Sequence, residues 1–143
     1  MILYCDTSAL VKLYLKEEAS DTMFAEAKSA SAVAVCRIAW AEIGAALSRR
    51  AREHPRDTAA VEEVRARLRA QWARYAIVEV TQALVELAAE YADTFALRGY
   101  DAVQLAGGRI VQEAAQESLR FACFDLRLRR AAKTLGMEVI GKV

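Results

Sequence analysis

Met1-Ile-Leu-Tyr-Cys-Asp6-Thr-Ser-Ala-Leu-Val-Lys12 is the stretch that decides the fold. Residues 2–5 are apolar and rich in strand-forming types, and this run ends at the carboxylate of Asp6, where a helical pattern begins. Thr7 and Ser8, which follow directly, are residue types that cap helices. The stretch therefore predicts a strand, an acidic tip and a helix in succession.

Phe121-Ala-Cys-Phe-Asp125-Leu126 repeats this arrangement near the other end of the sequence. An apolar run again ends at an aspartate, and a helical pattern continues to Leu135. Neighbouring strands of a parallel sheet lie about 4.8 Å apart. If the two strands are neighbours, Asp6 and Asp125 emerge together at one edge, where two carboxylates favour a bound cation.

Strands and helices alternate along the rest of the chain. Three further strands are predicted, at residues 31–36, 76–80 and 138–140, with helical patterns between them. This alternation predicts an α/β fold, a three-layer α/β/α sandwich around a central parallel sheet of about five strands. We expect Asp57 and Thr81 to cap the helices that follow them. One domain is expected over residues 1–143.

Charge and cysteine content limit the possible settings of the protein. The chain has 20 basic and 19 acidic residues, a net charge of +1 that neither demands nor excludes a polyanionic partner. The three cysteines lie in apolar runs without C-x-x-C spacing, which predicts free buried thiols in a reducing compartment. No signal peptide and no apolar run of membrane length is evident, so we expect a cytoplasmic protein that does not enter a membrane.

Two further acidic residues, Glu42 and Asp101, could lie near the carboxyl ends of the strands. Glu42 lies one turn inside a predicted helix between apolar neighbours, and Asp101 opens a helix after a glycine-containing turn. Each acid alone is more simply explained as a helix cap or a surface charge. Together with Asp6 and Asp125 they could converge beyond the carboxyl ends of the strands, where open α/β sheets bind ligands.

Four converging carboxylates predict a divalent metal site. Like charges in a partly dry cleft raise one another's pKa, and a cation removes that cost. Oxygen-only ligands favour Mg²⁺ or Mn²⁺ over zinc. The one histidine, His54, lies in a predicted loop beside Pro55, which excludes a Ser-His-Asp triad and a histidine zinc site. Such a site suits metal-dependent hydrolysis of phosphodiesters.

The order and spacing of these residues resemble the PIN-domain ribonucleases, and most of all the VapC toxins of bacterial type II toxin-antitoxin pairs. The resemblance spans nearly the whole chain and is carried by Asp6-Thr7-Ser8-Ala9-Leu10-Val11-Lys12-Leu13-Tyr14, Glu42, Tyr100-Asp101-Ala102, and Phe124-Asp125 followed by Leu128 and Ala131-Ala132. It implies an α/β/α sandwich that cleaves RNA endonucleolytically with Mg²⁺ or Mn²⁺. It also implies a homodimer and a small antitoxin partner.

Carried over residue by residue, the resemblance assigns the site. Asp6, Glu42, Asp101 and Asp125 match the acidic quartet that is catalytic and holds the metal. Ser8 matches a supporting hydroxyl, and Thr7 beside it is expected to support the site as well.

The chain departs from the family pattern at two places. Cys123 stands where relatives often have Thr, and Cys36-Arg-Ile-Ala-Trp40 precedes Glu42 where Ser or Thr is common. Both differences remove hydroxyls that could orient the metal ligands, so they bear on metal affinity.

Basic and aromatic residues add secondary expectations. We expect RNA phosphate contacts from the five basic residues nearest the acids: Lys12, Arg98, Arg127, Arg129 and Arg130. The arginine-rich segment 49–74 suits either an RNA surface or a solvated helix face. Trp40 and Trp72 suit either the core or a protein interface. The pair Gly107-Gly108 within a helix predicts a close approach of another segment.

Three other functions also group acidic residues at strand ends or share the PIN-like pattern. A phosphatase with an aspartyl nucleophile needs a second Asp two residues after Asp6, and Ser8 stands there. A receiver domain needs a late Lys beside the acids, whereas Lys133 lies in mid-helix. The alternative to the nuclease is a catalytically weak PIN-like module that binds metal, RNA or protein. The intact quartet argues against it.

Overall fold

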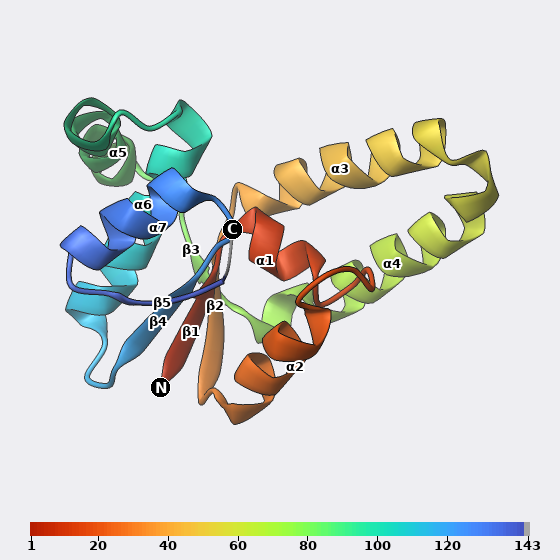
Figure 1. Ribbon diagram of the computed structural model, residues 1–143, viewed down its shortest axis with the longest axis horizontal. Coiled ribbons are helices and arrows are strands. Elements are labelled where there is room, and N and C mark those ends of the chain that lie inside the picture. The colour runs from red at the N-terminus through yellow and green to blue at the C-terminus, as the bar shows by residue number, and fades with distance from the viewer. Residues whose placement is uncertain (142–143) are drawn as a thin grey trace.

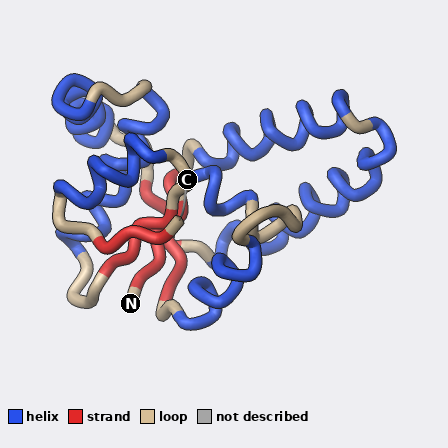
Figure 2. The backbone as a smooth tube through the Cα atoms, in the orientation of Figure 1, coloured by secondary structure: helices blue, strands red, loops and turns tan. Residues whose placement is uncertain are grey.

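The computed structural model describes residues 1–141 and shows a parallel sheet with helices on both faces (Figures 1 and 2). The strands are β1 (Ile2–Cys5), β2 (Ala32–Cys36), β3 (Ala76–Val78), β4 (Leu119–Ala122) and β5 (Glu138–Ile140). The helices are α1 (Thr7–Val11), α2 (Ser20–Ser29), α3 (Ala39–Glu53), α4 (Thr58–Gln71), α5 (Gln82–Phe95), α6 (Gly99–Ala114) and α7 (Leu126–Thr134). Short 3₁₀ turns, η1 (Pro55–Asp57) and η2 (Trp72–Arg74), flank α4.

The strand order β3-β2-β1-β4-β5 places β1 at the centre of the sheet, and every pairing is parallel. Cys5 of β1 is level with Ala122 of β4, so the two strands end side by side. The predicted α/β sandwich with a five-stranded sheet is confirmed. The predicted domain boundaries, residues 1–143, stay a prediction, and their last two residues lie outside the described range.

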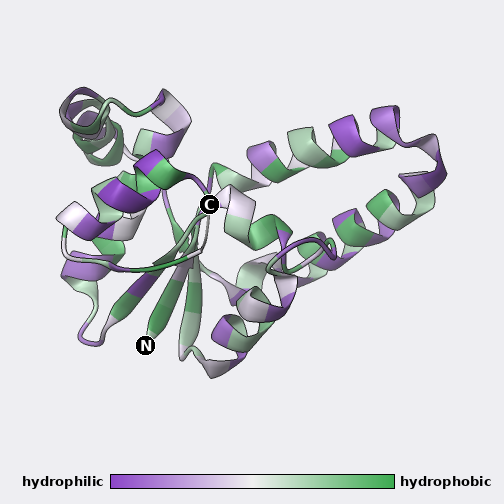
Figure 3. Cartoon of the chain, viewed as in Figure 1, coloured by the Kyte–Doolittle hydropathy of each residue, from purple (hydrophilic) through white to green (hydrophobic). Residues whose placement is uncertain are grey.

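Alternate residues of the strands enter two different cores. Tyr4 and Phe121 face the core covered by α5, α6 and α7, whereas Leu3 and Cys5 face the core covered by α1 to α4. This alternation follows from the two-residue period of a strand. Figure 3 shows hydrophobic residues gathered on the central strands. Both faces of the sheet are therefore buried, as a parallel sheet requires.

Helices α3 and α4 form a hairpin that projects from the sheet (Figure 1). Its tip is hydrophilic (Figure 3). Near its base Trp40 and Trp72 meet edge to face, with ring centroids 5.1 Å apart. Trp40 is 38% exposed, and Trp72 packs partly buried against the core beneath. Of the two positions left open by the sequence, Trp40 therefore lies at the surface.

Two of the predicted helix caps are wrong in detail. The Asp6 side chain caps α1, accepting from the Ala9 N–H, whereas Thr7 and Ser8 lie inside the first turn. Asp57 makes no side-chain cap to α4, because its carboxylate accepts from Arg50 Nε at 3.1 Å instead. Thr81 caps α5 as predicted.

Some predicted boundaries also move. β4 begins at Leu119 and ends before Cys123, and β3 ends at Val78 rather than residue 80. Helix α6 begins at Gly99, so Asp101 lies in its first turn and not at its first residue.

Gly107 and Gly108 make room for two aromatic rings of the sheet. A Cβ at Gly107 would collide with the Tyr4 hydroxyl, and one at Gly108 would lie 2.6 Å from the Phe121 ring. The two rings are stacked, with centroids 5.2 Å apart. The predicted close approach is confirmed, and the approaching groups are side chains of β1 and β4.

No helix within residues 1–141 combines the length and the apolar character that a bilayer crossing requires.

Candidate active site

Asp6 lies at the carboxyl end of the central strand and is 5% exposed. Its Oδ1 accepts from the Ser8 hydroxyl at 2.7 Å and from the Ala9 N–H at 2.9 Å. The Ser8 hydroxyl also accepts from the Phe124 N–H at 3.3 Å, which ties the end of β1 to the segment after β4. Ser8 therefore supports Asp6 through its hydroxyl, as the sequence predicted.

Glu42 stands in the first turn of α3 and is partly buried. Its Oε1 accepts from the Thr7 hydroxyl at 2.7 Å and from Gln104 Nε2 at 2.9 Å. Thr7 thus supplies a hydroxyl to Glu42, whereas the segment Cys36-Arg-Ile-Ala-Trp40 before Glu42 contains none.

Asp101 and Asp125 lie at two helix beginnings. Asp101 is in the first turn of α6 and is partly buried. Asp125 is exposed and caps α7, accepting from the Leu128 N–H at 2.8 Å. Because β4 ends beside β1, the cap of α7 reaches the same edge of the sheet as Asp6.

All four acids line one pocket of about 260 Å³. Its wall consists of Asp6, Thr7, Ser8, Glu42, Asp101, Gln104, Phe124 and Asp125. Four segments far apart in the sequence thus meet at the carboxyl edge of the sheet, as the sequence predicted. Within residues 1–141, no three acidic, histidine or cysteine side chains are already arranged as the ligands of one ion.

Burial and neighbouring acids raise the pKa of two carboxylates in the pocket. Burial raises the pKa of Asp6 to about 7, opposed by the hydrogen bonds from Ser8 and Ala9, and Asp101 and Glu42 raise it further. Burial, with the charges of Asp125 and Glu42, raises the pKa of Asp101, while Arg98 lowers it. Oxygen ligands that repel one another in a partly buried pocket fit a hard divalent cation.

The predicted phosphate-binding residues divide into two groups. Arg98, Arg127 and Arg130 line a hollow of about 400 Å³ whose wall includes Asp101 and Asp125. We call this hollow the arginine pocket. Lys12 and Arg129 line a separate hollow in which several acidic residues also lie. The structure therefore brings three of the five basic residues beside the acids.

The basic residues outside the arginine pocket are differently placed. Lys12 pairs with Glu17 at 2.9 Å and lies over the Phe124 ring. The arginines of segment 49–74 belong to the projecting hairpin, and none lines the acid pocket. Arg50 and Arg65 are paired with Asp57 and Glu62 there.

Gln104 lines the acid pocket although the sequence did not predict it as a site residue. It is 2% exposed and lies one turn after Asp101 on the same helix. Its Nε2 donates to Glu42 and to Thr7, and its Oε1 accepts from the Tyr4 hydroxyl. The signal was present in the sequence, because a glutamine at the i+3 position from a candidate ligand interrupts the apolar run Val103-Gln-Leu-Ala.

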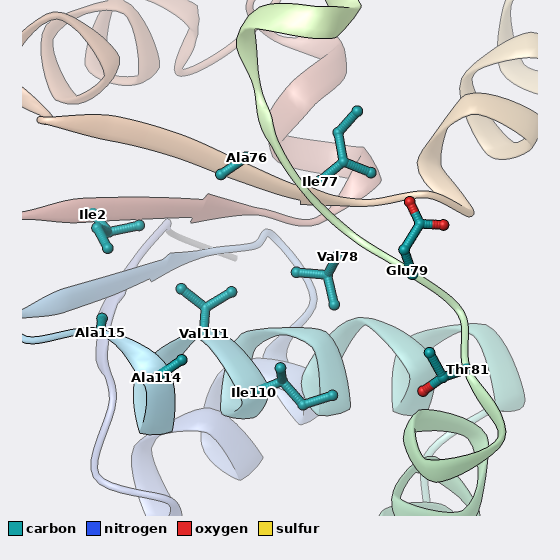
Figure 4. A pocket seen from close by; sticks show the side chains of 10 residues that line it. All are labelled: Ile2, Ala76, Ile77, Val78, Glu79, Thr81, Ile110, Val111, Ala114 and Ala115. Atoms are coloured by element: carbon teal, nitrogen blue, oxygen red, sulfur yellow. The ribbon is translucent and has the colours of Figure 1, made fainter.

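A larger hollow of about 600 Å³ lies elsewhere (Figure 4). Figure 4 shows it between β3 and the C-terminal half of α6, with mostly apolar side chains around it. None of the four acids belongs to its wall. The acid pocket is therefore separate from this mostly apolar hollow.

This fold is that of a PIN domain. Residues 3–134 match the model of the PIN domain family, and the chain belongs to that family. The resemblance read from the sequence is confirmed.

Individual relatives agree with this assignment. Ribonuclease VapC45 of Mycobacterium tuberculosis is 33% identical over 138 residues, which cover 96% of this chain and 94% of the relative. FitAcB from Neisseria gonorrhoeae has a similar structure, with a TM-score of 0.67, 18% identity, and coverage of 98% of this chain and 96% of that one. VapBC2 from Rickettsia felis, bound to a DNA fragment from its promoter, gives a TM-score of 0.64 at 14% identity, covering 99% and 98%. At these identities the two structures show the shared fold alone.

Proposed function

We propose that this protein is a Mg²⁺- or Mn²⁺-dependent endoribonuclease and the toxin of a type II toxin-antitoxin pair. The observation that carries the proposal is the meeting of Asp6, Glu42, Asp101 and Asp125 in one pocket at the carboxyl edge of the sheet. The relative VapC45 is named a ribonuclease, which supports the same reaction here.

The four acids would hold the cation, and the residues around them would hold the acids. The chemistry that such an ion supplies when bound is to lower the pKa of water and to neutralise charge on the phosphate. Ser8 and the Ala9 N–H fix Asp6, and the Leu128 N–H fixes Asp125. Preorganised ligands of this kind lose little freedom when the substrate arrives.

The arginine pocket would bind the RNA backbone beside the cleaved bond. Arg98, Arg127 and Arg130 have no carboxylate partner within 4 Å among residues 1–141, whereas Arg120 is paired with Glu26 and Glu138. Arginines without a carboxylate partner are free to bind phosphate. The arginine pocket is thus the side on which we expect the substrate to extend.

Partner proteins and cellular setting complete the proposal. Several structural neighbours, among them VapBC2, are toxin-antitoxin complexes, which supports a small antitoxin as partner of this chain. A homodimer is proposed on the family resemblance. Cys5, Cys36 and Cys123 are buried and free, which is compatible with the cytoplasm.

Cleavage of RNA by the purified protein tests the proposal. Single-stranded RNA should be cut internally in Mg²⁺ or Mn²⁺, EDTA should stop the reaction, and added Mn²⁺ should restore it. Asp101→Asn is the inactive control. RNA that is bound but left uncut would instead identify a non-catalytic binding module, and cleavage unaffected by EDTA would rule out the metal mechanism.

A further inference from the structure

Gln104 is a buried polar side chain with every hydrogen-bonding group in use. Its amide nitrogen donates to Glu42 Oε1 at 2.9 Å and to Thr7 Oγ1 at 3.2 Å. Its amide oxygen accepts from the Tyr4 hydroxyl at 2.9 Å. A buried amide without such partners would be strongly destabilising, so these contacts fix its position.

The chemistry of the neighbours decides which end of the amide faces which partner. An ionised Glu42 can only accept, so the amide nitrogen must face it. The Tyr4 hydroxyl can then donate to the amide oxygen on the other side. Tyr4 and Glu42 therefore both favour the same orientation of the Gln104 amide. In the flipped orientation the amide oxygen would face the carboxylate oxygen of Glu42, and two acceptors would repel each other.

The same contacts leave one oxygen of Glu42 available. Thr7 and Gln104 both donate to Oε1, and no donor within residues 1–141 bonds to Oε2. A carboxylate held by one oxygen is fixed in its rotation while the other oxygen stays free for a ligand.

We propose that Gln104 is a positioning residue that holds the Glu42 carboxylate in the orientation needed to bind the cation, and that Tyr4 sets the orientation of Gln104. The inference rests on the proposed function, because it concerns the same acid pocket. Tyr4 is itself fixed, since its ring stacks on Phe121 and its hydroxyl occupies the space left by Gly107. Packing inside the sheet is thereby linked to the placement of a metal ligand.

Gln104→Met removes both amide contacts while it keeps a side chain of similar length. We expect Mn²⁺ binding, measured by calorimetry without RNA, to weaken about 10-fold, because partners that orient ligands typically contribute roughly 10–100-fold to metal affinity. At a fixed, limiting Mn²⁺ concentration kcat should fall, while KM for RNA should stay within about two-fold.

Gln112→Met is the matched control. Gln112 lies on the same helix and its amide is also bonded, to Arg109 and to the Leu135 carbonyl, but it does not line the acid pocket. Its replacement should leave Mn²⁺ binding unchanged. If Gln104→Met and Gln112→Met bind Mn²⁺ equally well, the inference is wrong although the nuclease proposal stands. If wild-type protein neither binds Mn²⁺ nor cuts RNA, the proposed function itself fails.

Two further variants separate positioning from a loss of folding. Tyr4→Phe keeps the stacked ring and removes only the hydroxyl, so Mn²⁺ binding should weaken about three-fold, less than for Gln104→Met. In a Glu42→Gln background, Gln104→Met should have no further effect on Mn²⁺ binding, because the group that it positions is already altered. Additive losses in that cycle would show that Gln104 affects Mn²⁺ binding independently of Glu42, and the inference would be wrong.

Discussion

The acid pocket has two walls that hold their carboxylates in different ways. Asp6 and Glu42 form the fixed wall, where each carboxylate accepts two hydrogen bonds and Asp6 is almost fully buried. Asp101 and Asp125 form the open wall, which continues into the arginine pocket and where Asp125 is exposed. Hydrogen bonds therefore fix the carboxylates on one side of the pocket, whereas the other side is open beside the three arginines, where we propose that RNA enters.

Removing one acid from either wall should have the largest effect. Asp6→Asn on the fixed wall and Asp101→Asn on the open wall should each lower RNA cleavage by about 1,000-fold or more, because each removes charge that the cation needs. In Asp6→Asn the new amide oxygen can still accept from Ser8 and Ala9, so the fold should persist. Gel assays in Mn²⁺ measure the loss, and circular dichroism checks the helix content.

The outcome for Asp101 bears directly on the comparison. Substantial cleavage by Asp101→Asn, with Asp6→Asn inactive, would mean that the open wall serves substrate access only and binds no essential cation.

In the metal-free protein, the pH dependence of the free energy of unfolding should come mainly from the fixed wall. Burial raises the folded-state pKa of Asp6 from 3.8 to about 7, so the folded protein keeps a proton there that the unfolded chain has lost. Stability should therefore fall as pH rises from about 4 to about 7, and level off above that range. At pH 8 the shift corresponds to a cost of up to about 4 kcal/mol.

Asp6→Asn should remove most of this dependence and raise the free energy of unfolding at pH 8. Urea titrations in EDTA at pH 5 and pH 8 measure the difference. The pKa of Asp101 is raised too, and it should give a smaller change of the same sign, since solvent reaches this residue. Equal stability of wild type and Asp6→Asn at pH 8 would contradict the buried-charge account of the fixed wall.

Gly107→Ala should disturb the support of the fixed wall. The added methyl group would collide with the Tyr4 hydroxyl, and overpacking of this kind costs about 1–3 kcal/mol. Gly44→Ala in α3 is the control, because a Cβ there meets nothing within 4 Å. It should stabilise by roughly 1 kcal/mol through helix propensity. Thermal unfolding of both variants gives the comparison, and opposite signs are expected.

The smallest effect is expected on the open wall. Arg98→Ala should raise KM for RNA about three- to ten-fold and make binding less dependent on salt, because one phosphate contact is lost. Arg52→Ala on the projecting hairpin is the matched control and should leave KM unchanged. Salt titrations of RNA binding measure both. A larger effect from Arg52→Ala would place the RNA on the hairpin rather than in the arginine pocket.

The sequence predicted those features that depend on strand ends. Asp6 and Asp125 each close an apolar run, and parallel strands bring such ends to one edge without any knowledge of side-chain packing. The contacts of Gln104 could not be foreseen in this way, because they depend on how α6 is rotated against β1. Asp57 shows the same limit, since a nearby arginine competes with the helix end for its carboxylate.

The grouping of the basic residues was also beyond the sequence. Arg98 follows the left-handed Ala96 at the end of α5, and Arg127 donates to the Ala96 carbonyl at 2.9 Å. The arginine pocket therefore depends on the docking of α7 against the junction of α5 and α6, which no local pattern encodes.

Helix α6 carries Asp101, Gln104 and the two glycines within ten residues. This one helix thus carries a proposed metal ligand, the residue that we propose positions another ligand, and the two glycines that leave space for Tyr4 and Phe121 of the sheet. Replacing Gly107 or Gly108 by a larger residue to stabilise the protein would shift α6 and lower its activity at the same time. Stability and activity are therefore coupled through α6. Stabilising substitutions that leave activity unchanged should be sought on other helices.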